Sequence, residues 1–405
     1  MSGSRGTGTL CPMKTVDLVY FNAGGGHRAA ALALEQVIRQ QGRPWQVRLL
    51  NLTQVLDPQG HFRAVTGFEP EDLYNKRLAR GWTLGLAQEL KLLQAMIRLA
   101  HSAIVERLQQ HWLRSEPDLV VSLIPNFNRA LFESLASALP GVPFATVLTD
   151  MADLPPSFWI EPGQAQHLVC GTAHAAAQAR AGGYREWQIH RTSGMILRPD
   201  FYRDTPIHRG AERARIGLDA DTPVGLVLFG GHGSAAMKRI AWQLPETPLI
   251  LMCGKNAALA ETLRALPAAA PRVIVEFTPD VAYWMRLADF FIGKPGPGSL
   301  SEAVHSGLPV IVTRNAWTMP QERWNTDWVR QHRLGIVRRS FGTVQAAVDE
   351  LLARLPELRT NVRRLRNRAV FEVPEILAGI IAASELPQPW PSAPVPSQAS
   401  EPSSH

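Results

Sequence analysis

Short apolar segments alternate with helical patterns through most of the 405-residue chain, and this alternation limits the fold more than any other feature. Apolar runs rich in β-branched residues favour buried strands, and the Ala- and Leu-rich stretches between them favour helices. This order is typical of a doubly wound α/β protein with parallel sheets. Strands are expected at 16–21, 46–52, 118–124, 144–149 and 167–170, and again at 224–229, 249–252, 273–277, 290–292 and 310–313.

The expected strands fall into two series of similar length, and each series opens with a strand followed by a glycine turn. This pattern predicts two Rossmann-like domains that face each other across a cleft. The connector 194–210, which is polar and contains two prolines, marks the boundary between them. We therefore expect an N-terminal domain at 15–200 and a C-terminal domain at 201–385. The ends, 1–14 and the Pro/Ser-rich 386–405, are expected to be disordered.

The composition supports a globular protein, since 45% of the residues are hydrophobic and 19% are charged. The net charge of +7 suits an anionic partner such as nucleic acid, an acidic membrane surface or a phosphorylated small molecule. Nucleic acid is not expected, because no helix-turn-helix, zinc-finger or RNA-binding signature accompanies the charge. Basic residues also collect at 359–368, where a solvated helix face is expected ahead of a binding stripe.

The three cysteines, Cys11, Cys170 and Cys253, lie too far apart for a zinc site or a disulfide framework. The sequence has no apolar leader before the first expected strand and no uninterrupted apolar run of about 18 residues. These features predict a protein of the reducing cytoplasm that is neither secreted nor inserted across a membrane.

The first glycine turn stands in the stretch VDLVYFNAGGGHRAAALAL, residues 16–34. Gly24, Gly25 and Gly26 link a strand to a helix, and glycine permits both positive φ and the close approach of another molecule to the backbone. His27 is expected in the first turn of that helix, where free N–H groups attract anions and polar oxygens. Taken alone, the motif fits either a binding turn or a tight turn with a solvated histidine.

A second glycine turn, LFGGHGSAAM, follows the first expected strand of the second series. Gly230, Gly231 and Gly233 form this turn, and Ser234 is expected to open the next helix. Serine is also a good helix cap, so a purely structural role for Ser234 stays open.

The most informative segment is ADFFIGKPGPGSLSEAVHSGLPVIV, residues 288–312. A strand ends at Gly293, a Lys-Pro-Gly-Pro-Gly loop follows, and Ser299 is expected to start a helix. Bare N–H groups at such a helix start can bind a diphosphate without a metal, and Glu302 could accept hydrogen bonds from the two hydroxyls of a ribose. The segment therefore predicts a nucleotide-diphosphate site, with a capped helix as the structural alternative. No histidine cluster indicates a metal site.

Four blocks carry a family resemblance, namely GGGHRAAALAL, TVLTDMADLPPSFW, GGHGS, and GKPGPGSLSEAVHSGLPVIV continued by MPQERWN. Together they resemble the GT-B nucleotide-sugar glycosyltransferases. In particular, they resemble the group that contains monogalactosyldiacylglycerol synthase, bacterial diacylglycerol glucosyltransferases and the lipid II N-acetylglucosaminyltransferase. The blocks follow the order of that family from residue 22 to about residue 337, so the resemblance covers both expected domains.

The resemblance implies a GT-B fold and assigns roles by position. Gly25 and Gly26 would lie on the acceptor side, and His27 and Asp150 would lie near the reacting carbon. Glu302 would hold the ribose, and Gln321, Glu322 and Asn325 would contact the sugar hydroxyls. The donor-binding residues would be Gly230, Gly231, Gly233, Ser234, Lys294, Gly296, Gly298, Ser299, Glu302, Gln321, Glu322 and Asn325.

Members of this group are inverting enzymes, so the resemblance implies direct transfer of a hexose from a UDP-sugar to the hydroxyl of a membrane lipid, in diacylglycerol-type glycolipid synthesis. One base is needed, and imidazole has a suitable pKa, which makes His27 the first candidate and Asp150 the second. The UDP-sugar is a substrate, and no cofactor or metal is expected. Galactolipid synthases carry a His-Pro-Thr-Trp-Phe run where residues 155–159 of this chain are Pro-Pro-Ser-Phe-Trp.

Two alternatives stay open, a nucleotide-sugar epimerase of GT-B fold and a non-catalytic UDP-sugar-binding subunit. The long helical region 76–113 combines leucines with basic residues, so it could rest on an anionic membrane surface or pack in a core. With a lipid acceptor, the expected location is the cytoplasm, peripherally associated with the inner face of the cytoplasmic membrane. The identities of the sugar and of the acceptor lipid are left open.

Overall fold

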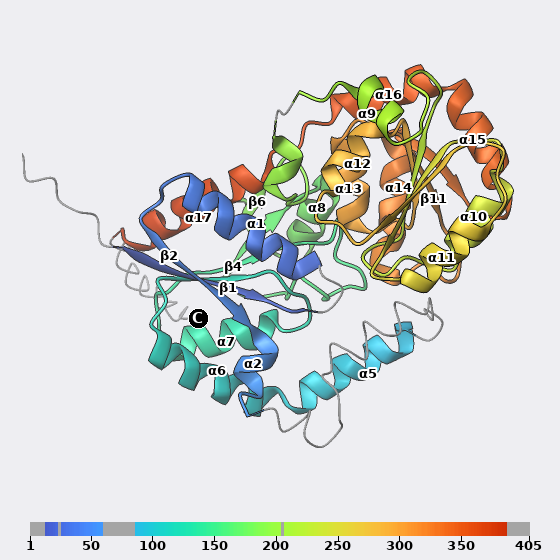
Figure 1. Cartoon of the computed structure of the whole chain (residues 1–405). Helices are drawn as coiled ribbons and strands as arrows, with labels where there is room; N and C mark the ends of the chain where they lie inside the picture. Colours follow the sequence, from blue (N-terminus) through green and yellow to red (C-terminus); the bar gives the residue numbers. More distant parts are fainter. Residues whose placement is uncertain (1–12, 23–25, 60–85, 204–205, 387–405) are drawn as a thin grey trace, which may run out of the picture.

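The structure is a computed structural model that describes residues 13–22, 26–59, 86–203 and 206–386. Two α/β domains lie side by side, and each is built on a six-stranded parallel sheet (Figure 1). The predicted fold class, two doubly wound Rossmann-like domains, is confirmed. The ends expected to be disordered fall almost wholly outside the described residues.

The sheet of the N-terminal domain has the strand order β2-β1-β3-β4-β5-β6. Its strands are β1 (Lys14–Tyr20), β2 (Trp45–Asn51), β3 (Leu119–Ser122), β4 (Phe144–Val147), β5 (His167–Cys170) and β6 (Ile189–Arg191). Its helices are α1 (Gly26–Gln40), α2 (Leu52–Leu56), α5 (Leu86–Leu99), α6 (His101–Ser115), α7 (Asn128–Ala138), α8 (Ala173–Ala181) and the short η1 (Glu186–Gln188). Side chains alternate along β1, so Val16 and Leu18 pack in a core with α1, whereas Val19 packs on the opposite face with α6 and α7.

The sheet of the C-terminal domain has the order β9-β8-β7-β10-β11-β12. With β7 taken as the first strand of the domain, this is the strand order of a Rossmann fold. Its strands are β7 (Gly225–Leu228), β8 (Leu249–Gly254), β9 (Arg272–Glu276), β10 (Phe290–Gly293), β11 (Val310–Thr313) and β12 (Gly335–Arg338). Its helices are η2 (Pro199–Tyr202) in the connector, then α9 (Arg209–Arg215), α10 (Ala236–Gln243), α11 (Ala257–Ala265), α12 (Val281–Leu287), α13 (Pro297–His305), η3 (Pro320–Glu322), α14 (Arg323–Gln331), η4 (Phe341–Thr343), α15 (Val344–Ala353) and α16 (Leu355–Arg364). The two glycine-rich turns follow β7 and β10, the pair of strands at which the order reverses.

The last helix of the described residues, α17 (Ala369–Ser384), crosses back to the N-terminal domain and packs against α1 (Figure 1). Val370, Val373 and Leu377 are buried in the same core as Val16 and Leu18 of β1. Just beyond the helix, Glu385 forms an ion pair with Lys14, with 2.7 Å between Oε1 and Nζ. The expected C-terminal span 201–385 therefore includes a helix that belongs structurally to the other domain.

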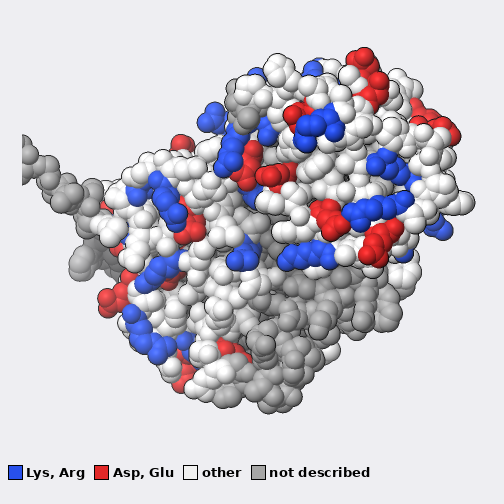
Figure 2. Space-filling view, viewed as in Figure 1, with Lys and Arg blue, Asp and Glu red and all other residues white. Residues whose placement is uncertain are grey.

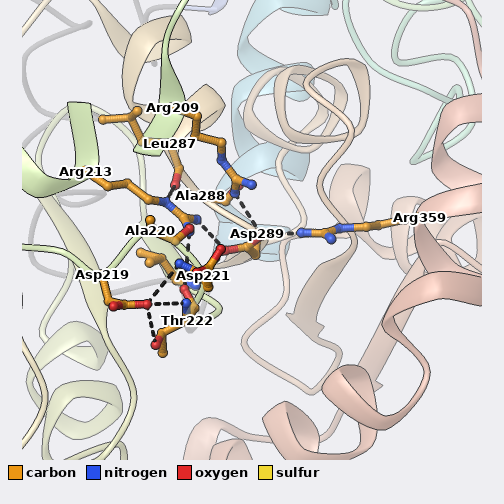
Figure 3. Close-up of polar contacts among 11 residues, drawn as sticks. Arg209, Arg213, Asp219, Ala220, Asp221, Thr222, Leu287, Ala288, Asp289 and Arg359 are labelled. Carbon is orange, nitrogen blue, oxygen red and sulfur yellow. Dashed lines mark hydrogen bonds and ion pairs between the residues drawn. The ribbon is translucent and has the colours of Figure 1, made fainter. Parts of the chain in front are cut away.

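A buried carboxylate fixes the start of β10 (Figure 3). Asp289 accepts hydrogen bonds from Arg209, Arg213 and Arg359, and from the backbone N–H of Val224 at 2.8 Å. The guanidinium of Arg213 is only 1% exposed and also donates to the carbonyl oxygens of Leu287, at the end of α12, and of the loop residues Ala220 and Thr222. The cluster thus ties α9 and α16 to the strand that carries the glycine-rich loop at its other end.

Candidate active site

His27 lies in the first turn of α1, as the sequence predicted. Its Nδ1 lies 3.0 Å from the hydroxyl oxygen of Thr149, which follows β4. Its ring lies against the indole of Trp159, with 5.9 Å between the ring centroids. Gly26 is the first residue of α1 and is exposed, whereas Gly25 lies outside the described residues.

The surroundings of His27 keep its imidazole neutral near pH 7. Burial lowers the pKa of His27 to about 4, and a backbone hydrogen bond with Leu123 opposes this only in part. A neutral imidazole carries a lone pair, so it can accept a proton from a hydroxyl group.

Asp150 follows Thr149 and is buried. The indole N–H of Trp159 donates to its Oδ2 at 3.0 Å. Burial raises the pKa of Asp150 to about 7, and the negative charge of Glu322 adds to the rise, while the Trp159 hydrogen bond and the Lys294 charge oppose it. Asp150 is therefore poised to change protonation near neutral pH.

Trp159 connects the two candidate bases, and the sequence analysis did not assign it a role. Its own position depends on Asp153, whose carboxylate accepts the backbone N–H groups of Ser157, Phe158 and Trp159 at 3.0, 2.9 and 2.6 Å. The usable signal in the sequence was an Asp placed before a Pro-Pro pair, since Asp side chains commonly hold the turn that follows them. Asp153 and Trp159 are thus positioning residues for the N-terminal half of the site.

In the C-terminal domain, α13 begins at Pro297 with Gly296 as its N-cap, two residues before the predicted start at Ser299. Proline suits the first helical position because its φ is fixed and its missing N–H has no partner there anyway. Gly298 and Ser299 consequently lie inside the first turn. The backbone N–H groups at the start of a helix have no partners within the helix, so those of this turn could bind a phosphate.

Lys294 and Glu322 lie over the backbone of Gly296. Their Nζ and Oε1 atoms form an ion pair at 2.8 Å, and Glu322 is buried. A Cβ at Gly296 would come within 3.3 Å of the Lys294 side chain and 3.4 Å of the Glu322 carboxylate. Glycine therefore leaves the space that these two side chains fill at the helix start.

Asn325 holds the glycine-rich loop in place through a hydrogen bond to its backbone. Its Nδ2 donates to the carbonyl of Pro295 at 2.7 Å, and its Oδ1 is buried without a partner among the described residues. Gln321 precedes Glu322 in η3 and is half-buried. In the structure Asn325 positions the loop that precedes α13. The family resemblance implied instead that Asn325 contacts the sugar.

Glu302 lies in the middle of α13 and is half-buried. Burial raises the pKa of its carboxyl, and the charge of Arg198 opposes the rise. Within the described part of the chain no hydrogen bond reaches this carboxylate, so both oxygens can accept bonds from a ligand.

The second glycine turn contains left-handed backbone at Gly230 and Gly233, with φ of 79° and 62°. A Cβ at Gly233 would lie 2.7 Å from Leu259, so only glycine fits there. The helix α10 begins at Ala236, later than the predicted start at Ser234. The Ser234 hydroxyl accepts the N–H of Ala236 at 3.2 Å, which is a local turn contact and leaves Ala235 as the cap.

The two halves of the site face each other across the domain boundary. Asp150 of one domain responds electrostatically to Glu322 and Lys294 of the other. Close by, the His174 ring of α8 stacks on the Trp324 ring of α14, with 4.5 Å between centroids and 9° between planes. Among the described residues, no group of three or more His, Cys, Asp or Glu side chains could hold a metal ion.

Comparisons with known proteins agree with this architecture. A probable monogalactosyldiacylglycerol synthase 2 of Oryza sativa subsp. indica is 28% identical over 339 residues, covering 80% of this chain and 70% of the relative. Monogalactosyldiacylglycerol synthase 1 of Arabidopsis thaliana is 25% identical over 385 residues, covering 89% and 70%. No protein-family profile matches the chain.

Among solved structures, MurG of Acinetobacter baumannii superposes with a TM-score of 0.58 at 14% identity, covering 90% of this chain and 99% of that one. HepE of Anabaena in complex with UDP-glucose gives 0.51 at 15% identity, covering 91% and 99%. A putative UDP-N-acetylglucosamine 2-epimerase of Listeria monocytogenes gives 0.57 at 14% identity, covering 93% and 97%. These likenesses define the fold as GT-B.

Within that fold, the relatives in sequence are glycosyltransferases, and the prediction of a glycosyltransferase is confirmed. The resemblance to the group that contains monogalactosyldiacylglycerol synthase is confirmed as well.

Proposed function

We propose that this protein is an inverting glycosyltransferase that moves a hexose from a UDP-sugar to the hydroxyl of a membrane lipid, in diacylglycerol-type glycolipid synthesis. The observation that carries the proposal is that Asp150, which Trp159 links to His27, lies within electrostatic reach of Lys294 and Glu322 at the glycine-rich start of α13. One side offers a base, and the other offers donors for a diphosphate. The lipid acceptor is inferred from the names of the relatives.

In this mechanism the acceptor oxygen attacks the anomeric carbon while the bond from that carbon to the UDP oxygen breaks. His27 takes the hydroxyl proton as the sugar acquires positive charge. The electron pair leaves with the UDP diphosphate, whose added charge is spread over the N–H groups of the first turn of α13. Lys294 would exchange its ion pair with Glu322 for the phosphate, which frees the Glu322 carboxylate to join Gln321 at the sugar hydroxyls.

The 2-epimerases that share the fold act on the donor alone, so the products separate the two functions. The purified chain should be incubated with a panel of labelled UDP-sugars and a total lipid extract, followed by mass spectrometry. A new glycolipid is the expected product. Conversion of the sugar without transfer would favour the epimerase, and donor binding without either product would favour a non-catalytic subunit.

Helix α5 supports the proposed contact with an anionic membrane surface. Leu92, Met96 and Leu99, which share one face of the helix, are 62%, 54% and 88% exposed, while Leu90 packs against the domain. On the face shown in Figure 2, basic and acidic side chains are interspersed over both domains. Residues 76–85 of the expected basic and apolar surface lie outside the described residues. None of the described helices has the length and hydropathy of a membrane span. From the exposed apolar side chains of α5 we propose peripheral attachment at the cytoplasmic face.

Replacing Glu302 with alanine should raise the dissociation constant for the UDP-sugar about tenfold or more, because two hydrogen bonds to a charged acceptor are lost. The chemical step should slow less, since a ribose contact is already made in the ground state. Calorimetric titration and single-turnover rates measure the two effects, with Glu302→Gln as the milder variant. An unchanged dissociation constant would exclude the ribose role.

Activity should survive chelation, because a helix start and a lysine supply the positive potential at the proposed diphosphate site. The measurement compares turnover before and after EDTA treatment. Loss of activity that a divalent cation restores would contradict this mechanism.

A further inference from the structure

An open cavity of about 550 Å³ lies where the domains are joined, away from the proposed donor loop. Its walls come from the connector helix η2, the last turn of α13, the end of α16 and the first turn of α17. The nine residues of α13 separate this cavity from the glycine-rich loop by roughly 13 Å along the helix. The cavity is thus a second candidate site.

Three arginines line this cavity, Arg363, Arg366 and Arg368. No carboxylate of the described chain forms an ion pair with any of them. Their neighbour Arg359 differs, because it binds the buried Asp289 (Figure 3). The basic residues at 359–368 therefore have two different roles. Arg359 forms a structural ion pair, and the three arginines form a positively charged part of the cavity wall.

Another part of the cavity lining is aromatic and contains an unsatisfied donor. The ring of Tyr202 lies 4.5 Å from that of His305 and 4.9 Å from that of Phe371. The Tyr202 hydroxyl is buried and has no hydrogen-bond partner within the described structure. A buried hydroxyl without a hydrogen-bond partner destabilises the folded protein, so a ligand that accepts a hydrogen bond from Tyr202 would remove this penalty.

We propose that this cavity binds a phosphate group, carried either by a free anion or by a lipid headgroup. Guanidinium groups match phosphate oxygens geometrically, and the Tyr202 hydroxyl can donate to the same group. The apolar wall formed by Val304, Val362 and Leu365 suits the rest of such a ligand. Because η2 and α17 join the two domains here, a bound phosphate would bridge them. The proposal does not depend on the function of the donor site.

The test is calorimetric titration of the full chain with inorganic phosphate in the presence of excess UDP, which occupies the donor site. Arg363→Gln/Arg366→Gln should weaken binding tenfold or more, since two charge-assisted contacts are lost. Tyr202→Phe, which removes only the hydroxyl, should weaken it by a smaller factor. Arg364→Gln is the matched control, because Arg364 is an exposed neighbour that does not line the cavity. It should bind phosphate like the unmodified chain.

Equal losses in the double variant and in Arg364→Gln would overturn the proposal, as would the absence of phosphate binding to the unmodified chain. If UDP itself fails to bind, the comparison of variants still reports on this cavity alone. Flotation with phosphatidylcholine vesicles, with and without dicetyl phosphate, identifies the source. Vesicle binding that the double variant loses and Arg364→Gln keeps indicates a lipid headgroup, and binding of inorganic phosphate alone indicates a free anion.

Discussion

Replacing His27 with alanine is expected to lower turnover at saturating donor and acceptor by about a hundredfold or more, which is the usual loss when a general base is removed. Donor binding and folding should change little, because His27 is half-buried and lies in the first turn of α1. Thr149→Val is the matched control. It removes the hydroxyl that lies 3.0 Å from Nδ1 but leaves the imidazole, so its loss should be much smaller. Near-normal turnover of His27→Ala would leave Asp150 as the base.

The pH dependence separates the same two candidates. The profile of kcat/KM reports the pKa values of the free enzyme. With His27 as base, the rate should fall only as the pH approaches about 4, where the imidazole becomes protonated. With Asp150 as base, the rate should fall below about pH 7. A decline near pH 7 that disappears in Asp150→Asn would assign the role to the carboxylate.

The Asp289→Asn substitution is expected to lower the free energy of unfolding by about 3–5 kcal/mol, because it leaves the buried Arg213 without a counter-charge. Urea denaturation measures this loss. Glu357→Gln is the control, since Glu357 pairs with Arg354 at the surface and is 47% exposed. That change should cost far less, because exposed ion pairs contribute little to stability. Similar costs for the two variants would contradict the structural role of the Asp289 cluster.

The acid response of this cluster has a definite sign. Burial opposes ionisation of Asp289, but hydrogen bonds from Arg209, the N–H of Val224 and Arg213 outweigh it and lower its pKa. A lowered carboxyl pKa stabilises the folded state above the ordinary pKa near 4, and this stabilisation is lost as the pH falls through the folded value. Stability of the unmodified chain should therefore decline on acidification below about pH 4, and Asp289→Asn should lack this part of the decline.

Much of the fold could be predicted because buried parallel strands are continuous apolar runs. The strands at 167–170 and 310–313 match β5 and β11 residue for residue. The sequence analysis missed β6, which has three residues and ends in arginine, and β12, which also ends in arginine. Both lie at sheet edges, where the apolar signal weakens.

The site was predicted less completely, because periodicity does not report contacts between distant segments. The glycine turns and Glu302 stand out in the sequence, whereas the ion pair of Lys294 with Glu322 depends on the packing of η3 against the loop. The role of Trp159 likewise depends on Asp153 folding the Pro-Pro segment. The helices predicted to start at Ser234 and Ser299 start at other residues in the structure. The prediction missed because serine is common both at helix caps and in first turns.

The return of α17 means that the polypeptide passes between the domains twice, once through the connector before α9 and once between α16 and α17. A single proteolytic cut in the connector would leave α17 seated on α1, so the two fragments would stay together as a noncovalent complex. A recombinant N-terminal half that stops near residue 200 would expose the apolar face that α17 covers and would tend to aggregate. An autonomous N-terminal domain would need residues 369–386 fused back to it.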